Sequence, residues 1–96
     1  MRRIRLTPAA QSDLAAIWEY SADHWGEAQA EAYVTLIRNR AQDLAEGRIV
    51  PRKADDVRPG YVVCAAGTHH LWCRMTEDAV DVIRILHQAM DVERNL

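Results

Sequence analysis

The feature of this sequence that most constrains its fold is a pair of helical stripes that follow one another almost without connecting residues. From Pro8 to Trp25, and again from Gly26 to Gly47, apolar and small side chains recur every three or four residues, which is the period of one helix face. The first stripe contains Leu14, Ile17, Trp18, Ser21, Ala22 and Trp25, and the second contains Ala30, Tyr33, Val34, Ile37, Ala41 and Leu44. So short a join predicts a helical hairpin, and its stripes need a further layer to cover them.

Strand-like segments flank this hairpin. Polar and apolar side chains alternate over residues 3–7, and Thr7 followed by Pro8 is typical of a helix start. Residues 48–60 are charged and contain proline and glycine, which predicts a loop. The runs that then favour β-strands are residues 61–65, 68–75 and 80–86. The predicted fold class is α+β in the order β-α-α-β-β-β, with the helical hairpin packed on an antiparallel sheet of three or four strands. The tail from residue 88 to 96 is too short to assign.

Length and composition indicate one globular domain spanning residues 1–96. The chain is 49% hydrophobic and 27% charged, which argues against disorder. No stretch approaches the roughly 18–20 apolar residues of a membrane span, and the basic residues 2–5 lead into no apolar segment of a signal peptide. We therefore expect a cytoplasmic protein. The net charge of −2 gives no overall attraction to nucleic acid, so direct DNA binding is not expected.

The cysteine and histidine residues do not predict a metal or cofactor site. Cys64 and Cys73 have no metal-ligand spacing, and we expect reduced, partly buried thiols. His69 and His70 are adjacent in a predicted strand and should point to opposite faces. His87 ends the last predicted strand, where it would either bond to the backbone or act as an acid or base, and no second catalytic group lies near it in the sequence.

The aromatic residues divide into core and surface candidates. Trp18 and Trp25 lie on the first helical stripe and are predicted to be core, and Tyr20, Tyr33 and Tyr61 are interpreted as packing residues. Trp72 differs, because it shares a strand face with His70 and Arg74. A sheet covered by helices on one side leaves its other side open, and we expect this exposed aromatic and basic face to contact a partner protein.

Five short motifs, in this order and spacing, resemble the ParE toxins of the RelE/ParE superfamily. The motifs are Leu14-x-x-Ile17-Trp18-x-Tyr20, Trp25-Gly26, Arg58-x-Gly60-Tyr61, Gly67-x-His69 and Ile85-Leu86-His87-Gln88-x-Met90-Asp91. The resemblance runs from about Arg5 to Asp91, so residues 1–96 are identified as a single ParE-like toxin domain.

The resemblance implies the toxin of a bacterial type II toxin–antitoxin system, one that poisons DNA gyrase and stops growth without acting as an enzyme. It also implies a hetero-oligomer with a ParD-like antitoxin, in which a ribbon-helix-helix half binds DNA and a C-terminal segment folds around the toxin. That segment is expected on the open sheet face, on the adjoining sheet edge or in the hairpin groove. The residues expected to bind it are Arg58, Tyr61, His70, Trp72 and Arg74, and those expected to contact the target are His87, Gln88, Met90 and Asp91.

Two alternatives accompany this hypothesis. Other branches of the superfamily are ribosome-dependent mRNA endonucleases of the RelE type, and cleavage of RNA needs a base, an acid and cations around the phosphate. Here Arg58, Arg74 and Arg84 could bind phosphate and His87 could transfer protons, but the paired lysines of the RelE type are absent and no tyrosine follows Tyr61. The second alternative is a decayed toxin that still binds its antitoxin but no longer inhibits growth.

Overall fold

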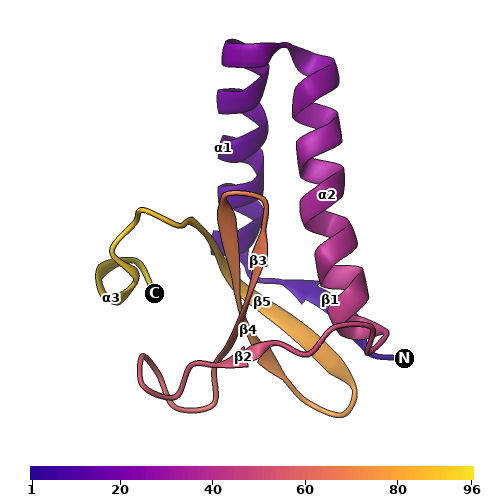
Figure 1. Cartoon of the computed structure of the whole chain (residues 1–96), viewed down its shortest axis with the longest axis vertical. Helices are drawn as coiled ribbons and strands as arrows, with labels where there is room; N and C mark the ends of the chain where they lie inside the picture. Colours follow the sequence, from indigo (N-terminus) through magenta and orange to yellow (C-terminus); the bar gives the residue numbers. More distant parts are fainter.

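The computed structural model describes residues 1–96 and contains the predicted hairpin, a sheet and a short C-terminal helix (Figure 1). The helices are α1 (Pro8–Trp25), α2 (Glu27–Ala45) and α3 (Val92–Asn95), and the strands are β1 (Arg3–Leu6), β2 (Arg52–Lys53), β3 (Val62–Ala66), β4 (His69–Met75) and β5 (Ala79–His87). The predicted α+β class is confirmed. The predicted loop contains β2, and the tail left unassigned contains α3.

Local sequence signals place both ends of the hairpin. The hydroxyl oxygen of Thr7 accepts a hydrogen bond from the Ala10 N–H at 3.1 Å, and Pro8 occupies the first turn, where it costs no backbone bond. Gly26 ends α1 and begins α2 with a φ of +90°, a conformation that side chains rarely adopt. The hairpin turn is therefore a single glycine.

The sheet has five strands in the order β1-β5-β4-β3-β2, and it is mixed rather than antiparallel. The first strand lies parallel to the last, with Arg3 opposite Ala79 and Leu6 opposite Val82, while the other neighbouring pairs are antiparallel. The expectation of three or four antiparallel strands was wrong, because alternation within a strand carries no information about its partner. The pairing of β4 with β5 shifts by one residue at Ile83, which forms a bulge.

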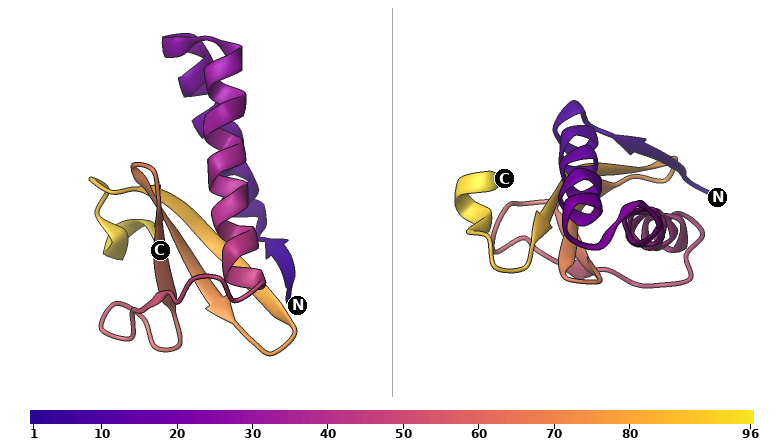
Figure 2. Two further views of the ribbon diagram at one scale, coloured as in Figure 1. Left: turned by 45° about the vertical axis from the view of Figure 1, so that its right-hand side comes forward. Right: turned by 90° about the horizontal axis from the view of Figure 1, so that it is seen from above.

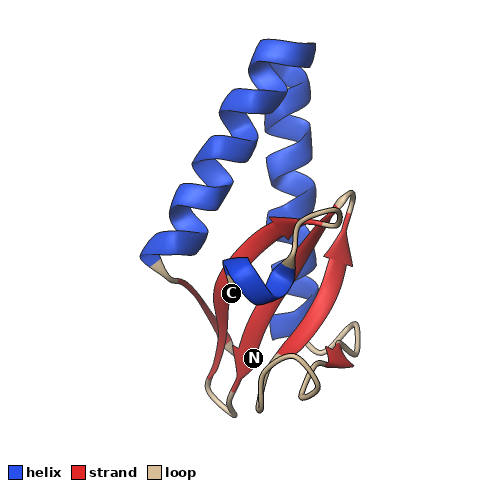
Figure 3. Ribbon diagram, turned by 90° about the vertical axis from the view of Figure 1, so that its left-hand side faces the viewer, coloured by secondary structure: helices blue, strands red, loops and turns tan.

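The sheet is covered on both faces. Between hairpin and sheet lies the main core of the molecule, which includes Leu14, Ile37, Leu44, Leu71, Val80 and Val82. A second apolar cluster of Ala54, Val63, Trp72 and Leu86 lies apart from it and packs against Val57, Tyr61, Val92 and Leu96. Figures 2 and 3 show α3 on the side of the sheet away from the hairpin. The loop before β3 and the C-terminal turn thus cover the face expected to be open.

The hairpin is longer than the sheet that it covers. Its tip, where α1 meets α2, extends well beyond the strands in Figures 1 and 2. Side chains near the tip therefore have no sheet beneath them, and Trp25 and Tyr20 are 64% and 58% exposed. The prediction of Trp25 as core and of Tyr20 as a packing residue was wrong, since the helical stripe continues past the end of the layer that buries it.

Candidate functional site

The face expected to bind a partner is rearranged by the second cluster. Trp72 is only 5% exposed, and it is packed among the apolar residues of the second cluster. His70 is half-buried, whereas Arg74 is exposed and its guanidinium lies 5.9 Å from the centre of the Tyr61 ring. The expectation that Trp72 is exposed was wrong, because the loop and the C-terminal turn cover it.

The three arginines expected to bind phosphate in an RNA-cleaving enzyme contact other groups of the protein. Arg84 makes a two-pronged ion pair with Asp13, at 2.7 and 2.8 Å. Arg58 donates to the main-chain oxygen of Leu96 at 3.1 Å, and Arg74 lies over Tyr61. The guanidinium groups of Arg84 and Arg58 are thus committed to a carboxylate and to carbonyl oxygens.

Both edges of the sheet are partly closed. Beyond the end of β1, the main-chain groups of β5 bond to the start of α1: Thr7 donates to the oxygens of Val82 and Ile83, and Asp13 accepts from the Ile85 N–H. At the other edge, two-residue β2 covers only the beginning of β3, and Arg40 donates to the Ala65 oxygen at 3.0 Å. Natural sheets block their edges in this way against unwanted strand pairing.

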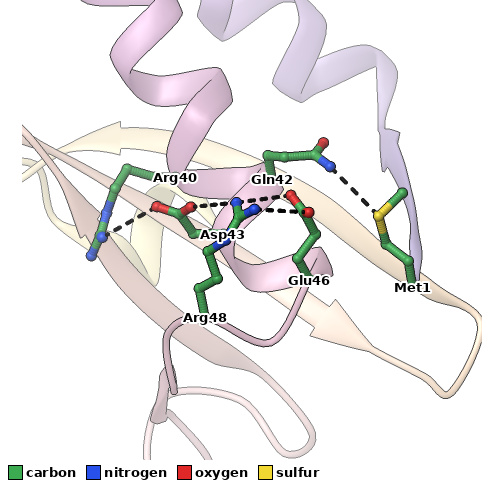
Figure 4. Close-up of polar contacts among 6 residues, drawn as sticks. All are labelled: Met1, Arg40, Gln42, Asp43, Glu46 and Arg48. Atoms are coloured by element: carbon green, nitrogen blue, oxygen red, sulfur yellow. Dashed lines mark hydrogen bonds and ion pairs between the residues drawn. The ribbon is translucent and has the colours of Figure 1, made fainter.

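Two arginines near the end of α2, Arg40 within the helix and Arg48 just after it, pair with acidic side chains. Arg48 forms ion pairs with Glu46 and Asp43, and Asp43 forms a second, longer ion pair with Arg40 at 3.8 Å (Figure 4). Exposed ion pairs of this kind contribute little stability. They do, however, offset the charges of Arg40 and Arg48.

A groove of about 730 Å³ lies between the overhanging hairpin and the turn that joins β3 to β4. Its walls come from α1 and α2, and its far end is formed by the turn and by the last residue of β5. The lining residues include Tyr20, Trp25, Tyr33, Thr68, His69 and His87. Beside it, the rings of Tyr20 and His24 are stacked 3.9 Å apart, and Trp25 meets Tyr20 edge-on. The groove therefore combines an exposed aromatic wall with a polar end.

The polar end of the groove is built around the hydroxyl of Tyr33. This hydroxyl accepts a hydrogen bond from the Thr68 N–H at 3.0 Å and lies 2.6 Å from Nδ1 of His69. His69 stands opposite His87 in the sheet, and the two rings meet edge to face at 5.2 Å. Burial, reinforced by the neighbouring His87, lowers the pKa of His69 below its usual value.

His87 bonds to the backbone, which is the first of the two alternatives that its position at the end of the last strand predicts. Its Nδ1 accepts the Ala89 N–H at 3.1 Å, which leaves Nε2 free for another contact. The two histidines belong to no cluster of three or more His, Cys, Asp or Glu side chains suited to a metal ion. Their arrangement supplies hydrogen-bond donors and acceptors rather than a metal centre.

Comparison with known proteins identifies the family. The family model described as "ParE toxin of type II toxin-antitoxin system, parDE" matches residues 4–92, which is nearly the whole chain. The chain belongs to the ParE toxin family. It is 44% identical to Toxin ParE1 of Mycobacterium tuberculosis over 95 residues, covering 98% of this chain and 97% of that protein. It is 34% identical to Toxin ParE1 of Caulobacter vibrioides over 96 residues, covering 100% and 99%.

Solved structures place the ParE chain among related folds. A chromosomal ParDE toxin–antitoxin system from P. aeruginosa superposes with a TM-score of 0.77 at 20% identity, covering 91% of this chain and 96% of that one. YafQ from E. coli gives a TM-score of 0.52 at 18% identity, covering 93% and 96%. At these identities the likeness concerns the fold alone. The prediction that the chain has a ParE-like fold is confirmed.

Sequence reasoning missed the grouping of Tyr33, His69 and His87 in this ParE toxin. From the sequence, Tyr33 is interpreted as a packing residue, His69 belongs to a family motif and is not expected to share a metal ion with His70, and no second catalytic group lies near His87. The available signal was strand pairing, because the turn at residues 76–78 folds β5 back along β4 and brings His87 near His69. The bulge at Ile83 then makes His87 the residue opposite His69.

None of the three helices carries an apolar stretch sufficient to span a lipid bilayer.

Proposed function

We propose that this ParE toxin inhibits growth by binding DNA gyrase without catalysing a reaction, and that a cognate ParD-like antitoxin neutralises it. The observation that carries the proposal is the commitment of Arg84 to Asp13. A phosphate-cleaving site needs a cation whose donors are aimed at the substrate. His87 at the end of β5, and Gln88, Met90 and Asp91 beyond it, are exposed and are the proposed contact with the target.

We further propose the groove beside Tyr20 and Trp25 as the antitoxin site, in place of the face around Trp72. Among the exposed large apolar side chains are these two rings, and they adjoin the groove. Aromatic side chains of this kind commonly dominate protein interfaces. Arg58, Tyr61, His70 and Arg74 lie on the other side of the sheet and are secondary candidates for the wrapping segment.

The binding mechanism predicts that the purified protein cleaves no RNA, with or without ribosomes. It also predicts inhibition of gyrase supercoiling, which a folded His87→Ala variant weakens by the loss of one of the four proposed contacts but does not abolish. General acid–base catalysis contributes about 10²–10⁴-fold, so an enzyme would lose most of its rate in a folded His87→Ala variant. Ribosome-dependent cleavage that disappears in that variant would replace this proposal with the RelE-type alternative.

The antitoxin site is tested by a matched pair of truncations. Trp25→Ala removes an exposed ring beside the groove and should weaken antitoxin binding by about 2 kcal/mol or more, measured by calorimetry. Val50→Ala removes a side chain that is 93% exposed outside the groove and should leave binding unchanged. Tight antitoxin binding by a wild-type chain that affects neither gyrase nor growth would support the decayed module instead.

A further inference from the structure

The C-terminal turn is fastened to the sheet by two arginine side chains. Arg84 donates through Nη1 to the Asn95 oxygen at 2.5 Å, and Arg58 donates through Nη2 to the Leu96 oxygen at 3.1 Å. Val92 and Leu96 pack on the second apolar cluster beneath. With only two apolar side chains as anchors, the position of α3 depends on the direction of these two guanidinium groups.

The direction of Arg84 is set from α1. Asp13 receives Nε and Nη2 of Arg84 at 2.7 and 2.8 Å, which leaves Nη1 as the donor aimed at Asn95. The same carboxylate accepts the Ile85 N–H at 3.0 Å. Both side chains are largely withdrawn from solvent, at 26% and 14% exposure. A planar fork held on two sides has one orientation, which a flexible lysine would not reproduce.

Between β5 and α3 the chain forms an exposed arch. Gln88 donates its N–H to the Thr68 oxygen at one end of the arch, and Asp91 caps α3 by accepting the Glu93 N–H at the other. Met90, at the centre, is among the exposed large hydrophobic residues. The arch is therefore fixed on the β4 side by its own backbone and on the α3 side by the arginine contacts.

We propose that Asp13 and Arg84 are positioning residues, which hold the arch of residues 88–91 in one conformation by fixing α3 behind it. A loop that is already ordered loses less conformational entropy when it binds. A fixed arch therefore binds a partner more tightly than a loose one. The consequence for the target rests on the proposed function. The positioning itself depends only on the contacts described above.

Asp13→Asn tests the positioning, because it keeps the size of the side chain while removing its charge. Hydrogen exchange in the C-terminal peptide should become at least about tenfold faster, which corresponds to about 1.4 kcal/mol. Exchange in β4 should remain unchanged. Asp81→Asn is the matched control. Asp81 lies on β5, the strand that carries Arg84, and it accepts two hydrogen bonds from Arg5, at 2.6 and 3.1 Å. This control substitution should leave the tail unchanged.

Arg84→Lys separates the two contacts of the arginine. Lysine keeps the positive charge next to Asp13 but cannot bond to Asp13 and Asn95 through a rigid fork. The tail should therefore loosen while the melting temperature changes little. Unchanged tail exchange in both Asp13→Asn and Arg84→Lys, or equal acceleration in Asp81→Asn, would overturn the positioning role.

Binding of purified gyrase to the same variants tests the consequence. We expect Asp13→Asn to weaken binding about tenfold and Asp81→Asn to leave it unchanged. Equal affinity of Asp13→Asn and wild type, despite a loosened tail, would overturn the link between arch and target. Absence of gyrase binding by the wild-type chain would overturn the proposed function together with this link, whereas the exchange data would still decide the positioning.

Discussion

His69 is the residue whose surroundings differ most from what its neighbours in the chain suggest. Its ring is half-buried against Tyr33 and faces His87, with Asp13 and His70 as further charged or titratable neighbours. Burial and the nearby histidine lower its pKa, so the folded state favours the neutral ring. A histidine whose folded pKa lies below its unfolded value of about 6.5 stabilises the fold above that pH. This stabilisation is lost as the pH falls toward the folded pKa.

The expected outcome is a loss of stability as the pH falls below the unfolded pKa of about 6.5, and this loss should be smaller in His69→Asn. Asparagine presents a polar atom near the position of Nδ1 and does not titrate. Urea unfolding at a series of pH values, at constant ionic strength, measures the effect. His24→Asn, at an exposed position on α1, is the control. An identical pH profile for wild type and His69→Asn would contradict the assignment.

Gly67 provides a second test at the scale of single residues. Its φ is +60°, and an added Cβ would lie 2.7 Å from the ring of Tyr33. Gly47 also has a positive φ, +74°, but nothing lies within 4 Å of an added Cβ. We expect Gly47→Ala to cost about 1–2 kcal/mol of unfolding free energy, from backbone strain alone. Gly67→Ala should cost measurably more in the same chemical denaturation experiment. Equal costs would show that Tyr33 moves aside freely.

At the scale of helices and strands, the sequence predicted whatever depended on local pattern. Thr7, Pro8 and Gly26 place the ends of α1 to the residue, and runs of strand-favouring residues located the three later strands within a residue or two. Strand pairing was harder to predict from the sequence than the positions of the strands. Without the bulge at Ile83, His69 would face Leu86 rather than His87, and nothing in the residues around Ile83 announces an extra residue.

The candidate site was less predictable than the elements that carry it. Tyr33 and His69 are 36 residues apart, and only tertiary packing makes them neighbours. The burial of Trp72 could not be predicted either, because it depends on a loop and a four-residue helix whose own sequence patterns are weak. Exposure of Trp25 depends on the relative lengths of hairpin and sheet, which neither segment reveals alone.

At the scale of the whole molecule, two of the three tryptophans, Trp72 and Trp25, occupy opposite environments. Trp72 is central to the second cluster, and truncation of such a buried ring to alanine costs about 3–5 kcal/mol. Trp25 stands on the overhanging tip of the hairpin, so Trp25→Ala should change the unfolding free energy by no more than about 0.5 kcal/mol. Thermal unfolding of the two variants measures the contrast. A large loss of stability in Trp25→Ala would mean that the tip is packed in solution.

The parallel pairing of β1 with β5 also has a consequence for the time at which the protein acquires activity. The only neighbour of β1 in the sheet is β5, so the first strand has no place to bind until the last one has been synthesised. Contacts between distant parts of a chain form late and slowly, and a nascent chain emerges from the ribosome beginning with its N-terminus. A ribosome making this chain therefore carries an unfinished sheet until residues 79–87 have been synthesised, and any activity that needs the complete sheet begins only after that point.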